Sequence, residues 1–139
     1  MTQDEELSRL MMIIEQYKEQ LNQIEMQISY LQQAINEYNK AKITVENLEK
    51  NEKNSDILMP IGGGTYIDAK AKNTKKILFD IGAGYVVEKK SQDAVEKIEE
   101  RTQELEKNIK RLQDIKTKTQ NEANEVYQKA QTLYQQQNE

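Results

Sequence analysis

The sequence contains no cysteine, no histidine and no tryptophan, and it has one proline and one phenylalanine. Without cysteine there are no disulfides and no thiol nucleophiles, and without histidine there is no Ser–His or Cys–His catalytic pair and no Cys/His zinc site. We therefore expect no enzymatic activity, no catalytic residue, no metal site and no cofactor. The lack of cysteine also fits a cytoplasmic location.

Apolar residues are scarce as well. They make up 36% of the 139 residues, against 32% for charged residues, so a single compact core is not expected. The longest apolar run, Leu10 to Ile14, is far too short to span a membrane, and the N-terminal residues do not resemble a secretory signal. The formal net charge of -4 gives no general attraction to nucleic acid. We expect neither a membrane nor a nucleic acid as a partner.

Two long stretches, residues 1–50 and 91–137, have the spacing of coiled-coil helices. In each, apolar residues recur at alternating steps of three and four, with one short step near Ala41 and another at Ile115. Ser91 is a plausible N-cap for the second helix. Because the helices are similar in length and joined by a short centre, we expect an antiparallel hairpin. The apolar residues along which the two helices would pack form a seam. In the first helix the seam contains Leu7, Leu10, Ile14, Tyr17, Leu21, Ile24, Ile28, Leu31, Ile35 and Tyr38.

The centre, residues 56–90, has the alternation and turn residues of two β-hairpins. Glycine supplies the positive φ that tight hairpin turns need. A phosphate-binding loop is a poor alternative, because each glycine group leads into a strand-like segment and not into a helix. The predicted turn glycines are Gly62, Gly63, Gly64, Gly82 and Gly84.

Four short strands cannot bury both of their faces, and a coiled coil has little spare apolar surface to cover them. We therefore expect the hairpins to join those of other subunits in a closed β-barrel that removes the free edges. The predicted fold is α+β, a single domain with a long antiparallel two-helix coiled coil and two central hairpins. The residues predicted for subunit assembly are Ile57, Leu58, Ile61, Tyr66, Ile67, Ile77, Leu78, Phe79, Ile81, Tyr85, Val86 and Val87.

Both ends of the chain carry more apolar residues than a two-stranded seam can hide, since such a seam holds about two residues in seven. These residues are either ordinary seam residues at a frayed helix end or an exposed binding surface, and the residues alone leave both interpretations open. They are Leu7, Leu10, Met11, Met12, Ile13, Ile14, Val126, Tyr127, Ala130, Leu133 and Tyr134.

The central segment "LMPIGGGTYIDAKAKNTKKILFDIGAGYVVEKK" resembles the alpha class of the prefoldin family. The parts "PIGGGTYIDA" and "DIGAGYVVEK" carry most of the resemblance, whereas the beta class has one hairpin in the centre. The resemblance implies a hexamer of two alpha-type and four beta-type subunits, with coiled coils extending from a double β-barrel.

The same resemblance implies an ATP-independent chaperone that captures unfolded or nascent polypeptides at the coiled-coil tips and transfers them to a group II chaperonin. It favours client binding by the apolar residues at the two chain ends. The alternative is a structural scaffold or tethering protein that oligomerises through its β-hairpins. A scaffold should have polar or sealed ends, so the apolar run from Leu10 to Ile14 favours the chaperone.

Overall fold

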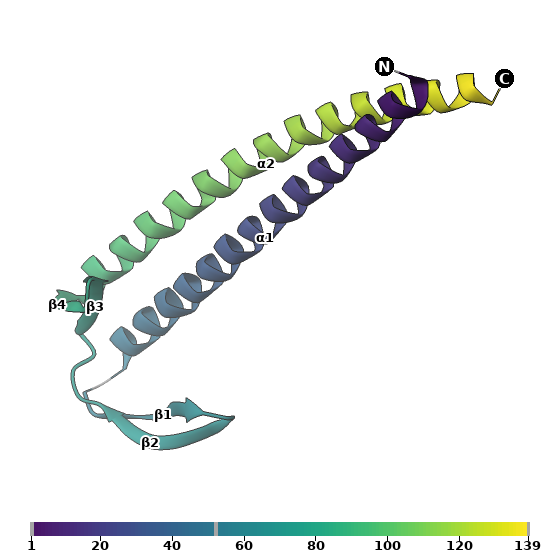
Figure 1. Ribbon diagram of the computed structural model, residues 1–139. Coiled ribbons are helices and arrows are strands. Elements are labelled where there is room, and N and C mark those ends of the chain that lie inside the picture. Colours follow the sequence, from purple (N-terminus) through teal and green to yellow (C-terminus); the bar gives the residue numbers. More distant parts are fainter. Residues whose placement is uncertain (1, 52, 139) are drawn as a thin grey trace. The chain divides into compact units, whose positions relative to one another are not determined.

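A computed structural model describes residues 2–51 and 53–138 of the chain. Two long helices enclose two antiparallel hairpins in sequence, which confirms the predicted α+β fold (Figure 1). The first helix ends at Lys50. The elements are α1 (Gln3–Lys50), β1 (Ser55–Gly62), β2 (Thr65–Ala71), β3 (Lys76–Gly82), β4 (Tyr85–Lys90) and α2 (Ser91–Gln137).

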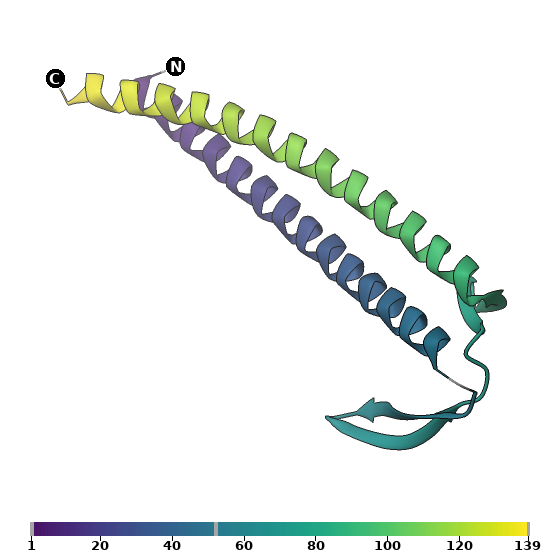
Figure 2. The ribbon, with the colours of Figure 1, turned by 180° about the vertical axis from the view of Figure 1, so that it is seen from behind.

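The chain divides into two compact units. The terminal unit consists of Met1–Gln33 and Leu105–Glu139, and the hairpin unit consists of Ala34–Glu104. Within the terminal unit α1 and α2 run antiparallel (Figure 2). Gln137 Nε2 donates to Asp4 Oδ1 at 2.8 Å, and Lys116 Nζ lies 3.1 Å from Glu25 Oε1. The two pairs are separated by the same number of residues on both helices, so the register between the helices is constant in this unit.

The seam is more regular than the sequence predicted. The predicted α1 positions from Leu7 to Tyr38 are all buried or half-buried. Ala41 and Ile115 are exposed, however, so the predicted short step at Ile115 was wrong, and the one predicted near Ala41 falls later, between Val45 and Leu48. Lys42 and Lys116 occupy the half-buried positions instead, and with them the alternating steps of three and four continue to Val45 on α1 and to Leu133 on α2. The prediction failed because an apolar residue stands directly before each lysine and was counted in its place.

Each of these seam lysines forms an ion pair with a glutamate of the other helix. Lys42 Nζ lies 2.8 Å from Glu99 Oε1 in the hairpin unit, and Lys116 pairs with Glu25 in the terminal unit. The lysine side chains are 33% and 31% exposed, so their aliphatic parts lie in the seam while the ammonium groups reach its edge. The hydrogen bond from Lys42 to Glu99 and the attraction between their charges raise the pKa of Lys42 above its ordinary value.

A charged residue in an apolar seam specifies the register at a cost in stability. We predict that Lys116→Leu raises the free energy of unfolding by about 1 kcal/mol, because leucine buries more apolar surface at this position. Urea denaturation followed by circular dichroism measures the change. Lys118→Leu is the control, since Lys118 is exposed on the same helix and should change stability by less than about 0.5 kcal/mol. Equal effects of the two substitutions would contradict the position assigned to Lys116.

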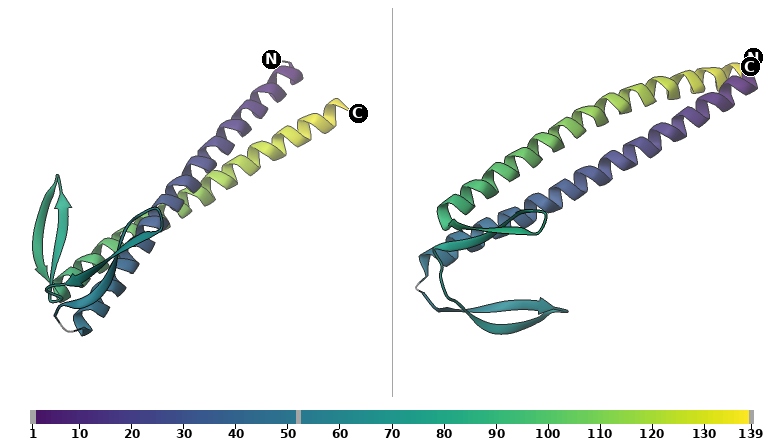
Figure 3. Two further views of the ribbon diagram at one scale, coloured as in Figure 1. Left: turned by 90° about the horizontal axis from the view of Figure 1, so that it is seen from below. Right: turned by 60° about the vertical axis from the view of Figure 1, so that its left-hand side comes forward.

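The four strands form two separate two-stranded sheets, β1 with β2 and β3 with β4 (Figure 3). Gly62 pairs with Thr65 and Gly82 with Tyr85, which leaves the two-residue loops 63–64 and 83–84. Both residues of each loop have positive φ, the conformation of a type I′ hairpin turn. The two hairpins therefore close with the same turn, although Ala83 stands in the second where glycine stands in the first.

Ala83 adopts φ 53° and Gly63 adopts φ 57° at the equivalent position, and a Cβ at Gly63 would have no neighbour within 4 Å. Left-handed alanine costs about 1–2 kcal/mol, whereas glycine loses about 0.5–1 kcal/mol more conformational entropy on folding. We predict that Ala83→Gly stabilises the second hairpin by about 0.5–1 kcal/mol and that Gly63→Ala destabilises the first by a similar amount. Amide hydrogen exchange of the hairpin residues measures both effects, and a change of the same sign in both hairpins would refute the assignment.

The second hairpin packs against the helices of the hairpin unit. Phe79 is buried with Ala94 and Ile98 of α2, and Tyr38, Ile77 and Val87 pack around them. The expectation that the coiled coil has little spare apolar surface for the hairpins was therefore wrong for the three hairpin residues of this cluster. Alternation along β3 and β4 turns these side chains toward α2, and it turns Leu78 and Val86 away.

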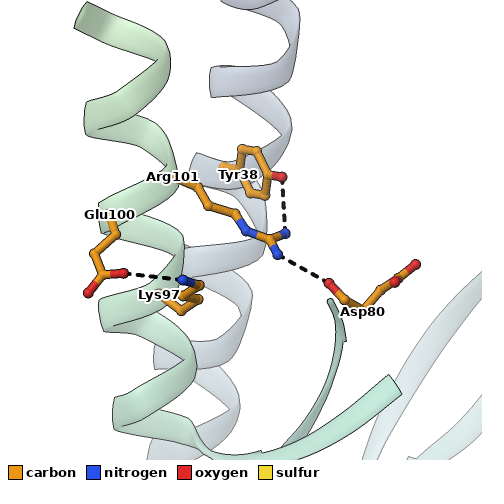
Figure 4. A network of polar contacts seen from close by, with 5 residues as sticks. All are labelled: Tyr38, Asp80, Lys97, Glu100 and Arg101. Atoms are coloured by element: carbon orange, nitrogen blue, oxygen red, sulfur yellow. Dashed lines mark hydrogen bonds and ion pairs between the residues drawn. The ribbon is translucent and has the colours of Figure 1, made fainter. Parts of the chain in front are cut away.

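Arg101 ties the second hairpin to both helices (Figure 4). Its Nη1 donates to Tyr38 Oη and its Nη2 donates to the carbonyl oxygen of Asp80, each at 3.3 Å. Its guanidinium carbon lies 4.6 Å from the centre of the Phe79 ring, a distance that permits a cation–π interaction. Asp80 itself accepts a hydrogen bond from the N–H of Gly82 at 2.8 Å, so its carboxylate supports the turn.

The start of α2 is held by a buried polar contact. Ser91, the predicted N-cap, is the first residue of the helix, and it is 2% exposed. Its N–H donates to the carbonyl oxygen of Lys75, and its hydroxyl donates to that of Thr74, both at 2.9 Å. The hydroxyl thus anchors the connection between β2 and β3 to the helix.

Candidate functional site

Apolar residues near the chain ends line a groove on one side of the terminal unit. The groove is open and has a volume of about 630 Å³. Its apolar lining comes from both helices and belongs entirely to the predicted client-binding set: Leu7, Met11, Ile14, Tyr127, Ala130 and Tyr134. We call this the apolar groove.

Helical spacing explains why these residues share one side. The apolar lining residues follow one another at steps of four and three on α1 and of three and four on α2, which places each set on one helix face. Half of them belong to the seam. The others, Met11, Tyr127 and Tyr134, stand beside the seam and are 59%, 51% and 58% exposed. The groove therefore combines three seam residues with three exposed residues that stand beside them.

The polar groups around the apolar groove are partly paired with one another. Lys18 Nζ donates to Glu15 Oε1 at 3.2 Å, and Gln131 Nε2 donates to Tyr127 Oη at 3.3 Å. Gln135 completes the lining. Sequence reasoning did not single out these polar residues, although the helical spacing that groups the apolar residues would have indicated them.

A second groove, of about 600 Å³, has a different character. Leu10 and Leu133 line it, but charged and polar side chains surround them, among them Glu6, Arg9 and Lys129. The helical spacing of residues 6, 9 and 10 places this groove on the other side of the seam from Met11. The two sides of the terminal unit thus differ, one being apolar and the other polar.

The remaining predicted client-binding residues do not line either groove. Met12 is 67% exposed on α1, and Ile13 and Val126 are half-buried. Residues 11, 12 and 13 are adjacent in sequence, but each helical residue is rotated by about 100° from the previous one. The structure therefore separates Met11 from Met12 and Ile13, which the sequence had grouped together.

The two hairpins carry a second group of exposed apolar side chains. Leu78 and Tyr85 are the most exposed, at 72% and 70%. Met59, which the sequence did not single out, lies opposite Ile67 and is exposed with it. Apolar surfaces of this kind mark sites of protein–protein contact. The exposed set comprises Leu58, Met59, Ile61, Tyr66, Ile67, Leu78, Ile81, Tyr85 and Val86.

Within residues 2–51 and 53–138, no three acidic side chains come together in a way that could hold a metal ion. No helix within the same ranges has both the length and the apolar character that crossing a bilayer requires.

The chain belongs to the prefoldin family, since the family model described as "Prefoldin subunit" matches residues 17–136. Relatives from two archaea carry the name prefoldin subunit alpha, as the central segment had indicated. The relative from Nitrosopumilus maritimus is 36% identical over 128 residues, covering 91% of this chain and 82% of the relative. The one from Archaeoglobus fulgidus is 27% identical over 128 residues, covering 92% and 93%.

A solved structure shares the fold. A chain of filamentous PFD from Methanocaldococcus jannaschii, determined by cryo-EM, superposes with a TM-score of 0.59 at 20% identity. The match covers 87% of this chain and 94% of that chain. At this identity the likeness concerns the fold, two long helices with hairpins between them.

Proposed function

We propose that the chain is a subunit of an ATP-independent cytoplasmic chaperone that captures unfolded or nascent polypeptides and transfers them to a group II chaperonin. The apolar groove is the observation that supports this proposal most directly, because Met11, Tyr127 and Tyr134 remain exposed beside the seam. Membership of the prefoldin family supports it independently.

The chemistry of the groove suits partners without a fixed structure. Methionine is flexible and polarisable and can fit irregular apolar surfaces, and tyrosine offers a large ring with a polar end. A contact of this size is weak, but several copies of the groove in one assembly raise the effective concentration of each for a bound chain. Release then requires only a competing binder, and no nucleotide.

The proposed partners for assembly are beta-type prefoldin subunits, in a hexamer of two alpha and four beta chains. The exposed faces of the two hairpins support this proposal, because each presents apolar side chains that the described residues of the hairpin unit do not cover. The buried cluster around Phe79 already fixes one side of the second hairpin. Its other side, with Leu78 and Val86, is free for another subunit.

The alternative function, a structural scaffold or tether, makes no use of the apolar groove. A scaffold gains nothing from three exposed apolar side chains beside the seam, and these raise its risk of aggregation. The two functions therefore differ in one measurable respect. Removing an exposed groove residue impairs a chaperone but leaves a scaffold intact.

We predict that Met11→Ser weakens the suppression of client aggregation, while Met12→Ser leaves it unchanged. Both methionines are exposed on α1, but only Met11 lines the apolar groove. Loss of the buried contact with a client costs about 1 kcal/mol per site, or roughly fivefold in affinity. Light scattering of a denatured client diluted into the assembled chaperone without ATP measures the effect.

The Met12→Ser variant makes this comparison internally controlled. The two substitutions change helix propensity by the same amount, because they exchange the same residue types within the same helix. Equal suppression by the wild type and Met11→Ser would remove the groove from client binding. Equal loss in both variants would show that the effect comes from the helix and not from the groove.

For assembly, we predict that Leu78→Ser reduces association with beta-type subunits at least about tenfold, since Leu78 would be buried in the complex. Tyr30→Ser is the matched control, because Tyr30 is 70% exposed but lies on α1, outside the hairpins. Mass measurement by light scattering after size-exclusion chromatography reports the complexes formed. A normal complex with Leu78→Ser would argue against assembly through this face.

A further inference from the structure

We propose that the first hairpin packs one face against a helix of a neighbouring subunit of different sequence, in the way that the second hairpin packs against α2. This inference rests on the proposed assembly, in which that neighbour is of the beta type. It adds which face of the hairpin meets a helix and what that helix presents. We call this face the uncharged face, and it consists of Ile57, Met59, Ile67 and Ala69.

The two hairpins repeat one sequence pattern. Residues 57–70 and 77–90 align without a gap, and six of the 14 positions are identical. The strand pairing repeats as well. Met59 pairs with Ile67 in the first hairpin, and Phe79 pairs with Val87 at the equivalent positions of the second. Equivalent residues therefore lie on equivalent faces. The identical positions are Ile57, Leu58, Ile61, Gly62, Gly64 and Lys70, each with the same residue 20 positions later.

The second hairpin shows what covers the equivalent face. Phe79 is buried against Ala94 and Ile98 near the start of α2, and Ile77 and Val87 pack around them. Ala94 is 0% exposed and Ile98 is 3% exposed. The small side chain of Ala94 lets the strands approach the helix closely, and Ile98, four positions further, lies on the same side of the helix. This face therefore fits a helix that carries a small and a branched aliphatic residue four positions apart.

In the first hairpin the same face is apolar but largely uncovered. Met59 and Ile67 stand where Phe79 and Val87 stand in the second hairpin, and they are 48% and 52% exposed. Ile57, the equivalent of Ile77, is half-buried. The described residues of the hairpin unit thus leave open a face whose counterpart is packed on a helix.

The charges of the first hairpin lie on its other face. The alternation of the strands places Asp56, Asp68 and Lys70 on the side opposite to Met59. Ala69 replaces the lysine that stands at position 89 of the second hairpin, which removes the charge from this face. Burying the uncharged face therefore costs no desolvation of a charged group, whereas burying the other face does.

The covering helix comes from a subunit of different sequence. Ala94 and Ile98 are already covered by the second hairpin, and in a second copy of this chain they are covered in the same way. Ile43 is an exposed aliphatic residue on α1 of the hairpin unit, but Asn39 and Asn47 stand four positions from it. The described helices of this unit therefore offer no second pair of the required kind.

Single cysteines test whether the uncharged face is buried in the assembly, since the chain has no cysteine of its own. Alkylation of Met59→Cys by iodoacetamide should be at least about tenfold slower in the complex with beta-type subunits than in the isolated chain, because buried thiols react poorly. Tyr30→Cys is the control. Tyr30 is 70% exposed on α1, outside the hairpins, so its cysteine should react at the same rate in both samples.

Photo-crosslinking then identifies the neighbour. Met59→benzoylphenylalanine should crosslink to a helix of the beta-type subunit in the assembled complex, and peptide mass spectrometry locates the crosslinked residue. Ile77→benzoylphenylalanine is the matched control at the equivalent position of the second face. It should crosslink to the start of α2 in its own chain, because Ile77 packs against the cluster with Ala94 and Ile98.

A crosslink from position 59 to a strand, to its own chain or to a second copy would overturn the inference. Unchanged alkylation of Met59→Cys in a complex that forms normally would do the same. If aggregation is suppressed while position 59 stays accessible, this inference falls and the proposed function stands. If position 59 crosslinks to a partner helix but aggregation is not suppressed, the proposed function falls and the inference stands. If no complex forms with beta-type subunits, the proposed assembly and the inference fall together.

Discussion

Two helices can bury only one narrow stripe of side chains between them, and the rest of the structure depends on this constraint. A seam of this kind holds about two residues in seven. Every further apolar side chain must be covered by another element or remain exposed. In the hairpin unit, Phe79 is covered by the start of α2, whereas Leu78 on the opposite face is not. In the terminal unit, Met11 stands beside a filled seam and lines an open groove. The candidate sites consist of the apolar side chains that the seam cannot bury and that no other element covers.

Because the seam is narrow, the two seam lysines are important for the register between the helices. A stripe so narrow has few specific contacts, and an apolar seam alone tolerates shifts of a whole heptad. Lys42 and Lys116 each contact a glutamate across the seam, so a shifted register would separate two ion pairs. Exposed ion pairs contribute little to stability, but a charged residue inside a seam discriminates strongly between registers. The register in turn decides which residues of the two helices meet in the apolar groove.

Much of the fold could be predicted from local spacing. The repeat of three and four residues predicts both helices, and the glycine groups predict both hairpin turns. Both kinds of element depend on residues that are close in sequence. The seam lysines and the burial of Phe79 could not be predicted in this way. Ala41 and Ile115 fit an apolar repeat better than the lysines that follow them, and only the opposite helix shows that the lysines have partners. Likewise, the fact that Met11 and not Met12 lines the apolar groove depends on how α1 is rotated against α2, whose lining residues are more than a hundred positions away.

The difference between the two sides of the terminal unit has a consequence for any assembly that contains several copies. Because the apolar groove lies on one side of the terminal unit only, the orientation of each unit matters as well as its position. Under the proposed function, two such units can bind the same unfolded chain only when their apolar grooves face a common space, and a half turn of one of them presents Arg9 and Lys129 there instead. The number of copies in a complex therefore sets the largest number of grooves that could contact one bound chain. The rotation of each copy about its own axis decides how many of these grooves do so.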